Sequence, residues 1–429
     1  MKRFRQLGFV AIASLSVWLS TTSIVIAQTM RAHFIDVGQG AATLIEFPCA
    51  AVLIDTGGES NGEFDSTAAL MAYLDTFFAR RTDLEKTLAS IILTHPHVDH
   101  TRGVPTVIGK YKILNAVTNG LEEGSGKAGQ IALHTKASES EAVGSSERIG
   151  FVAVRRQDVP QGTGLTNAII DPVSCPTVDP KITALWGSFA STPAGWKAAE
   201  FQNLNNHSVA IRIDFGKASF LVTGDLEEVA IRDFIAAYQG TSMLDVDVYE
   251  VGHHGSANGT TEALLRAITP AMAVIEMGPS TRQVPWTAWA YDHPRKVIVD
   301  LLQKYVSTTR PTTTVQTATA VKTFTSVSLT KAIYGTGWDG TVVLEADVNG
   351  TWKTADSSTT PPTTSLLNVN TASVDELQTL PRIGEVRAKA IIKYRTDNGP
   401  FQTVDDLGKV PGIGPSTLNG IRKLVTTGG

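Results

Sequence analysis

The stretch Thr94-His95-Pro96-His97-Val98-Asp99-His100 follows directly on the apolar run Ile91-Ile92-Leu93. Three of the nine histidines in the chain fall within these seven residues, which is a concentration that chance composition does not explain. The apolar run predicts a strand, and the polar residues predict a loop at its end. In an extended loop His95 and His97 project to the same side and can reach one metal ion. Asp99 and His100 then turn toward a second ion, about 4 Å away.

Imidazole and carboxylate ligands favour zinc, with manganese as the alternative. A structural zinc ion is closed by four protein ligands, commonly cysteines, but Cys49 and Cys175 are the only cysteines and have no ligand spacing. The pattern therefore predicts a catalytic site with two divalent ions. In an exported chain two cysteines are the number that forms one disulfide, and two unpaired buried thiols remain the alternative.

The composition is that of a globular protein, because 42% of the 429 residues are hydrophobic and only 18% are charged. The length predicts two domains, one of them large. Residues 1–27 combine a basic start, an apolar run and a small residue at Ala27, as in a cleaved secretory signal peptide. A retained membrane anchor is the alternative. We expect a secreted or periplasmic protein without stable membrane insertion after cleavage.

Short β-branched runs between turn residues predict strands, followed twice by a helix. The predicted strands are 30–37, 42–47, 51–54, 90–94, 208–215, 218–223 and 246–251, with helices over 59–78 and 226–238 and a closing hairpin at 341–346 and 350–353. Residues 121–150 are rich in Gly, Ser, Glu and Lys and are predicted to be a long surface loop. This order of elements is typical of a layered α/β fold.

The histidine-rich stretch resembles the His-x-His-x-Asp-His motif of the metallo-β-lactamase superfamily, which implies an αββα sandwich over residues 28–354. Residues 34–40 and 51–58 resemble the extracellular metallo-β-lactamase domain of ComEC-type competence proteins. That resemblance implies that Asp55 orients the metal-binding loop without touching the ions.

Three further segments resemble the same group. Val222-Thr223-Gly224-Asp225 implies that Asp225 bridges both ions, and Val251-Gly252-His253-His254-Gly255-Ser256 implies that at least one of its two histidines is a ligand. Tyr291-Asp292-His293-Pro294 implies that His293 lines the active site as a ligand or as a hydrogen-bond donor to the transition state, so Asp99 and His293 are the catalytic candidates.

The remaining histidines are less clearly placed by the sequence. His207 precedes the strand that leads to Asp225, where many superfamily members supply an imidazole, and it is either a metal ligand or a substrate-binding residue. His33 and His134 lie outside every motif and are expected to be structural or surface residues.

The C-terminal region begins after a linker rich in Ser, Thr and Pro at 355–365. Within 366–429 the pentapeptides 380–384 and 410–414 echo each other, and each precedes a helical run. This pairing resembles the tandem helix-hairpin-helix domain of ComEA-type DNA receptors, and implies a small all-α domain that binds DNA. Glycine turns at helix N-termini present backbone N–H groups to phosphate, and nearby lysines add charge. The DNA-binding candidates are Gly384, Lys389, Gly412, Gly414 and Lys423.

A net charge of −4 excludes a strongly basic footprint over the whole chain, while residues 365–429 carry a net charge of +2. The sequence therefore favours an exported nuclease or phosphodiesterase that holds DNA without reading its sequence. The alternatives are a metallohydrolase of a non-nucleic substrate, such as a phosphocholine ester, a lactam or a lactone, and a non-enzymatic DNA-binding uptake protein. The complete metal motif argues against the last, and the fold alone cannot choose between substrates.

Overall fold

The computed structural model of the chain describes residues 28–142, 148–355, 367–378, 380, 383–422 and 424–427. The predicted signal peptide, most of the predicted linker and Lys423 lie outside these residues. Within the described ranges, every helix is too short or too polar to cross a lipid bilayer.

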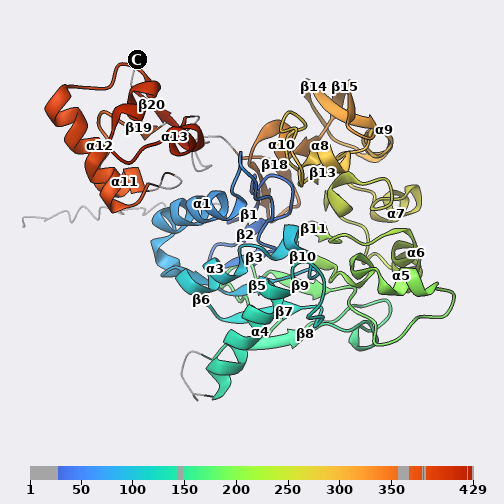
Figure 1. Ribbon diagram of the computed structural model, residues 1–429. Coiled ribbons are helices and arrows are strands. Elements are labelled where there is room, and N and C mark those ends of the chain that lie inside the picture. The colour runs from blue at the N-terminus through green and yellow to red at the C-terminus, as the bar shows by residue number, and fades with distance from the viewer. Residues whose placement is uncertain are drawn as a thin grey trace, which may run out of the picture.

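Two β-sheets form the large domain (Figure 1). The first sheet has the order β18 (Trp352–Thr354), β17 (Val342–Asp347), β1 (Thr29–Phe34), β2 (Thr43–Glu46), β3 (Ala51–Ile54), β5 (Ser90–Ile92), β7 (Asn115–Thr118) and β8 (Gly150–Ala153). The second sheet has the order β16 (Ile333–Gly335), β13 (Met272–Ile275), β12 (Val248–Glu250), β11 (Ala218–Val222), β10 (Ile211–Phe215) and β9 (Lys181–Ala184). The predicted closing hairpin corresponds to β17 and β18.

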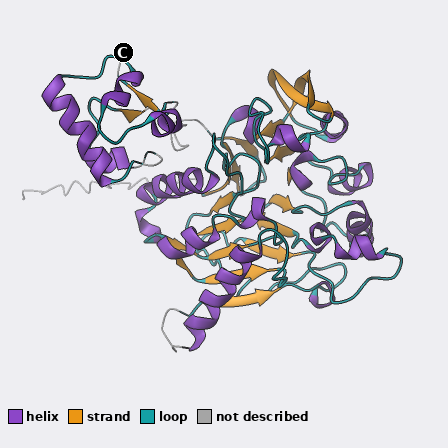
Figure 2. Cartoon of the chain, in the orientation of Figure 1, coloured by secondary structure: helices purple, strands orange, loops and turns teal. Residues whose placement is uncertain are grey.

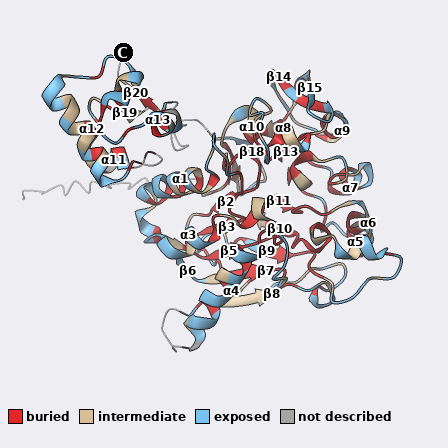
Figure 3. Ribbon diagram, in the orientation of Figure 1, coloured by how far each residue is buried: buried red, intermediate tan, exposed pale blue. Residues whose placement is uncertain are grey.

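Side-chain alternation along the strands divides the interior into layers. In the first sheet Leu44 and Leu53 pack with the helices on its outer face, whereas their neighbours Ile45 and Val52 pack toward the second sheet. A strand with two buried faces must lie between a helical layer and another sheet. Figure 3 shows the result, with buried strands inside and helices exposed on their outer sides. The predicted αββα sandwich is confirmed.

The helices cover the two outer faces (Figures 1 and 2). The first sheet is covered by α1 (Ser66–Arg80), α3 (Val104–Lys110) and α4 (Lys127–Ala142), and the second by α6 (Glu228–Ala237), α7 (Glu262–Ile268) and α9 (Lys296–Tyr305). Helix α1 begins seven residues later than predicted, because the Asp65 carboxylate accepts a hydrogen bond from the backbone N–H of Ala68 and caps the helix there.

Two elements differ from the sequence-based expectation. Residues 121–150 are not one long loop, because they contain the 16-residue helix α4, which buries Leu133 and Ala137 against the first sheet. A long antiparallel hairpin of β14 (Thr309–Ala320) and β15 (Thr323–Lys331) was not predicted at all. Its strands are rich in threonine and only a few of their side chains are buried, so they lack the apolar alternation that indicates a strand.

The strand order brings the predicted site residues to one end of the sandwich. Strands β3, β5 and β7 are parallel neighbours in the first sheet, as are β11, β12 and β13 in the second. Asp55 follows β3, the histidine-rich stretch follows β5, Asp225 follows β11 and His253 follows β12. Carboxyl ends of parallel strands lie at one edge of a sheet, so loops from both sheets meet there.

The C-terminal region has a hydrophobic core of its own, built from residues between Val369 and Val425. It comprises α11 (Val374–Gln378), α12 (Glu385–Asn398), the short helix η5 (Val404–Lys409) and α13 (Pro415–Ile421). The two-residue strands β19 (Leu367–Asn368) and β20 (Val425–Thr426) pair in parallel and join the ends of the domain. The separate core indicates an independently folding helical unit.

Candidate metal centre

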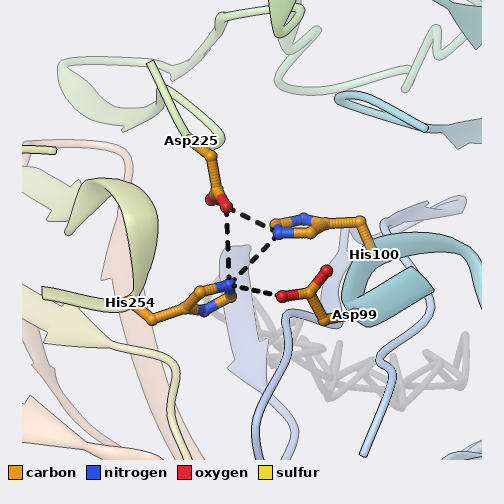
Figure 4. A group of neighbouring side chains, drawn as sticks. All are labelled: Asp99, His100, Asp225 and His254. Carbon is orange, nitrogen blue, oxygen red and sulfur yellow. Dashed lines mark hydrogen bonds and ion pairs between the residues drawn. The ribbon is translucent and has the colours of Figure 1, made fainter. Parts of the chain in front are cut away.

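Four side chains converge at the meeting point of the two sheets: Asp99, His100, Asp225 and His254 (Figure 4). Their ligand atoms all lie within 4.8 Å of one another. Nε2 of His100 lies 3.3 Å from Asp225 Oδ1, and Nε2 of His254 lies 3.4 Å from Asp99 Oδ2. This group could hold a divalent cation.

A second group of imidazoles also approaches the Asp225 carboxylate. Nε2 of His95 is 3.0 Å from Nδ1 of His97 and 3.7 Å from Asp225 Oδ2. Nε2 of His253 is 3.8 Å from the same oxygen. Nitrogens of both histidine groups thus lie within 4 Å of the Asp225 carboxylate, so this carboxylate can serve as a ligand shared by two ions.

Hydrogen bonds beneath the cluster fix which ring nitrogen faces inward. Nδ1 of His100 donates to Asp55 Oδ2 over 2.7 Å, and Asp55 also accepts from the backbone N–H and the hydroxyl of Thr94. Nδ1 of His254 donates to the backbone carbonyl of Glu276 over 2.8 Å. Both Nε2 atoms therefore point into the cluster, where each can bind a metal ion once its proton has left, as metal-binding histidines do.

The donor geometry fits a metal ion. The two inward Nε2 atoms of His100 and His254 lie 3.2 Å apart. Two ring nitrogens at this distance need either a proton or a metal cation between them. Zn–N bonds of 2.0–2.1 Å in a tetrahedral arrangement place two nitrogens about 3.3 Å apart. The spacing of the His100 and His254 nitrogens therefore suits zinc, the ion that imidazole and carboxylate ligands predict.

The backbone around the cluster is held in an unusual conformation. Asp55, His253 and His254 all have positive φ, at 55°, 51° and 53°. Left-handed backbone is unfavourable for residues with a Cβ, and such residues gather at functional sites where the surrounding structure compensates. Two consecutive histidines in this conformation account for the sharp turn η4 (Gly252–Gly255), which directs both imidazoles to the same carboxylate.

Electrostatics favour the protonation states that a metal needs at several of these groups. Burial lowers the pKa of His95 well below its usual range, and the nearby His100 lowers it further, so His95 is neutral at pH 7. Burial alone would raise the pKa of Asp225, but the imidazoles of His100 and His254 lower it well below its usual range. Burial likewise opposes the charge on His100, yet Asp225 and Asp55 raise its pKa well above normal, so a proton competes with a cation there.

The cluster opens into a cleft of about 470 Å³. His293 lies in this cleft, and its Nδ1 is 3.0 Å from the side-chain amide nitrogen of Gln39. Three buried polar atoms of residues that line the cleft have no hydrogen-bond partner: Gln39 Oε1, Asn205 Oδ1 and His253 Nδ1. His253 Nδ1 has the Glu227 carboxylate 3.7 Å away, whereas Gln39 Oε1 and Asn205 Oδ1 mark places where a ligand could complete the site, because buried polar groups normally find partners.

His207 is not part of the cluster. Its Nε2 lies 2.6 Å from the carbonyl oxygen of Phe201, and its Nδ1 accepts a hydrogen bond from the backbone N–H of Phe189. Both ring nitrogens therefore bond to the backbone, so of the two roles expected for His207, metal ligand or substrate-binding residue, this geometry gives no support to the first. Asn205, in the same short helix η3 (Leu204–His207), faces the cleft instead, with its amide nitrogen 3.5 Å from His253 Nε2.

Sequence reasoning also missed several residues that line the cleft, among them Gln39, Trp286 and Tyr291. Gln39 and Tyr291 lie within motifs that were singled out for other residues, and this was the available signal for these two. Buried His33 bonds to Tyr73 and Glu46, and exposed His134 pairs with Glu122, in line with the structural and surface roles expected of them. The sulfur atoms of Cys49 and Cys175 are joined in a disulfide, away from the metal cluster.

The two hairpins of the C-terminal domain repeat the same contacts. Ile383 N–H bonds to Leu380 O in the first, and Ile413 N–H bonds to Val410 O in the second. Gly384 and Gly414 then occupy the N-cap positions of α12 and α13. Gly412 has a φ of +88°, which a residue with a Cβ rarely adopts. Lys389 lies on the exposed first turns of α12, paired with Glu385.

Comparisons with known proteins agree with this architecture. The family model of the metallo-beta-lactamase superfamily matches residues 35–275. The chain belongs to the metallo-beta-lactamase superfamily. A helix-hairpin-helix motif model matches residues 363–426.

The curated relatives include, by name, a recombination protein and two proteins of the ComE operon. Recombination protein 2 of Haemophilus influenzae is 26% identical over 279 residues, which is 65% of this chain and 27% of that protein. ComE operon protein 3 of Bacillus subtilis is 25% identical over 284 residues, which is 63% of this chain and 30% of that protein. The chain thus spans less than a third of either relative. ComE operon protein 1 of Bacillus subtilis is 46% identical over 61 residues, 14% of this chain and 30% of that protein. The resemblance to ComEC-type competence proteins, with an added helix-hairpin-helix domain, is confirmed.

Proposed function

We propose that this superfamily member is an exported phosphodiesterase that hydrolyses DNA at a site for two divalent ions. The observation that carries the proposal is the pairing, in one chain, of a complete His/Asp cluster with a helix-hairpin-helix domain. A hydrolase of small esters or lactams has no evident use for a domain that holds phosphate backbones.

The proposed ligand sets follow the distances. His95, His97 and His253 would hold one ion, and Asp99, His100 and His254 would hold the other, with Asp225 shared. Zinc is the expected metal, with manganese as the alternative. When bound, the ions supply Lewis acidity toward a phosphodiester and lower the pKa of water.

The chain's own residues would position the substrate. Gln39 lies on the Nδ1 side of the His293 ring. If Gln39 donates to that nitrogen, Nε2 of His293 carries the proton. Burial, together with the charge of His254, lowers the pKa of His293 well below its usual range, so the ring is a neutral hydrogen-bond donor. A neutral donor in a buried cleft can stabilise the charge that develops on a phosphate oxygen without binding the free anion too tightly.

The test is hydrolysis of DNA by the purified chain, with and without chelator, after loading with zinc or manganese. We expect chelator-sensitive cleavage that Asp99→Ala abolishes while the circular dichroism spectrum is unchanged. Cleavage of a phosphocholine ester, a lactone or a lactam but not of DNA would contradict the proposal. So would DNA cleavage that survives Asp99→Ala.

DNA holding by the C-terminal domain is tested separately, because that domain has its own core. We expect residues 365–429 alone to bind DNA without sequence preference and in the micromolar range or weaker, because their net charge is only +2. Counterion release should give a linear log–log salt dependence. Gly412→Ala should weaken binding, whereas Gly399→Ala, at another left-handed glycine outside the hairpins, should not. No binding by the isolated domain at low salt, while the full chain still cleaves DNA, would make the domain an interaction module.

A further inference from the structure

One side of the metal cleft is lined by aromatic rings that lead from the cluster to solvent. The His254 and His293 rings lie 5.8 Å apart, His293 and Tyr291 6.0 Å apart, and Tyr291 and Trp286 6.2 Å apart, measured between ring centroids. His293 and Tyr291 are nearly parallel, at 23°. Exposure increases along the series, from 7% at His293 to 43% at Tyr291 and 67% at Trp286.

Trp286 is held in a position that costs the fold stability. Its φ is +65°, in the left-handed region that bulky side chains rarely adopt. Its indole is two-thirds exposed, so the chain gives up most of the free energy that burial of a tryptophan would contribute. Strained backbone and an exposed aromatic ring at the entrance of a cleft together point to a ligand that covers the ring.

The rest of the cleft is polar. Arg102 lines it, and the backbone carbonyl of Gly58 accepts a hydrogen bond from its Nε, which leaves the terminal nitrogens of the guanidinium available. Ser60 and Ser125 line it as well. A ligand that suits this cleft has a flat aromatic part for the ring side, and an anionic part for the arginine and the metal cluster. A nucleotide unit has both.

We propose that Trp286 and Tyr291 form a stacking platform for the nucleobase beside the phosphodiester that is cleaved, and that the cleft therefore takes single-stranded DNA. This rests on the proposed function and adds the strand form of the substrate. Aromatic side chains stack on every base, with a strength that depends little on sequence. In a duplex the base faces are already stacked on each other, and freeing one costs a few kcal/mol. Duplex DNA should therefore be cleaved only where its ends fray.

The first test measures binding without catalysis. A tetranucleotide containing 2-aminopurine is titrated with the full chain, once in chelator and once with metal and the Asp99→Ala variant. Stacking on an aromatic ring quenches the 2-aminopurine fluorescence, so we expect quenching by both proteins. Trp286→Ala should weaken binding by between about 5-fold and 100-fold, the range for loss of one base–aromatic stack.

Trp289→Ala is the matched control. Trp289 lies three residues away, under the ammonium group of Lys322 at 4.5 Å, and does not line the cleft. We expect this variant to bind the tetranucleotide as the unchanged chain does. An equal loss of affinity in Trp286→Ala and Trp289→Ala would mean that both changes disturb the structure of this segment. The Trp286→Phe variant then decides, because quenching that is restored by a smaller aromatic ring supports stacking. Absence of quenching at millimolar concentrations in every condition would overturn the proposal.

The second test compares substrates in the steady state. We expect the metal-loaded chain to cleave a single-stranded oligonucleotide with a lower KM than a blunt hairpin duplex of equal length. An oligonucleotide with one abasic residue beside the scissile phosphate should lose about the same factor in KM as Trp286→Ala loses on the intact strand. The two changes should not add, because both remove the same contact. Additive effects, or a duplex cleaved as well as the single strand, would overturn the platform while leaving the nuclease proposal intact. If no DNA is cleaved at all, the proposed function is contradicted. The fluorescence titration then decides by itself whether Trp286 and Tyr291 stack on a nucleobase.

Discussion

Asp55→Asn should weaken metal binding without touching an ion. The Asp55 carboxylate has two different duties: Oδ1 accepts from the backbone N–H of Thr94 over 2.8 Å, and Oδ2 accepts from the Thr94 hydroxyl over 2.6 Å and from His100 Nδ1 over 2.7 Å. Asparagine has only one acceptor atom. If its NH₂ group faces His100, the His100 proton must move to Nε2, where it blocks the metal-binding lone pair. If the NH₂ group faces Thr94 instead, it meets the Thr94 backbone N–H, and two donors then face each other without an acceptor.

Loss of such an outer partner costs about 10- to 100-fold in metal affinity, which is about 1.4–2.8 kcal/mol. The assay is a competition titration of the chelator-treated protein with zinc and a chromophoric chelator, with circular dichroism to verify folding. Asp75→Asn is the control, because Asp75 is an exposed carboxylate whose partners are Lys110 and Tyr111. An Asp55→Asn protein that is folded and binds both ions as tightly as the unchanged chain would refute the argument that Asp55 sets the tautomer of His100.

Three further outcomes are expected. His207→Ala should keep both ions by elemental analysis, because both of its ring nitrogens bond to backbone groups, whereas His254→Ala should lose one. Replacing Cys49 and Cys175 by Ser should lower the free energy of unfolding in urea by about 4–5 kcal/mol, since the bond closes a loop of 126 residues; an unchanged midpoint would show that no bond forms. Burial opposes the charge on Glu46, but His33 and arginine partners lower its pKa below 4.5, so its ionisation stabilises the fold above that pH. This contribution is lost as the pH falls from about 5 toward 2, and Glu46→Gln should show a weaker pH dependence of unfolding over that range.

Residues that lie at the ends of apolar strands were the predictable part of the site. The runs before His95, Asp225 and His253 alternate or are fully apolar, so both their strand character and the position of the following loop can be derived from the sequence. The same runs predict a layered α/β fold, and the resemblance to the metallo-β-lactamase superfamily implies the αββα sandwich.

Side-chain direction within short turns could not be predicted. Asn205 and His207 are two residues apart in the helix η3, and only the fold shows that the amide faces the cleft while the imidazole turns back to Phe201. The position of Trp286 was not predicted. Tryptophan rarely adopts a positive φ and is seldom so exposed, and no pattern in the sequence indicates either feature. The polar β14–β15 hairpin was missed for a related reason, since its tip at Val321 and Lys322 carries no glycine or asparagine turn signal.

The ligands of the metal cluster come from both halves of the sandwich. Asp99 and His100 follow strand β5 of the first sheet, and Asp225 and His254 follow strands β11 and β12 of the second. A cation bound among them therefore acts as a further tie between two layers that are also joined by apolar packing and by the hydrogen bond from Thr43 in β2 to Glu250 in β12. Each ion that binds only the folded chain adds about 2.7 kcal/mol of stability at a free concentration 100 times its dissociation constant. Metal supply would then set the stability of this protein as well as the occupancy of its site. A strong chelator would first remove the ions and then make the fold easier to unfold.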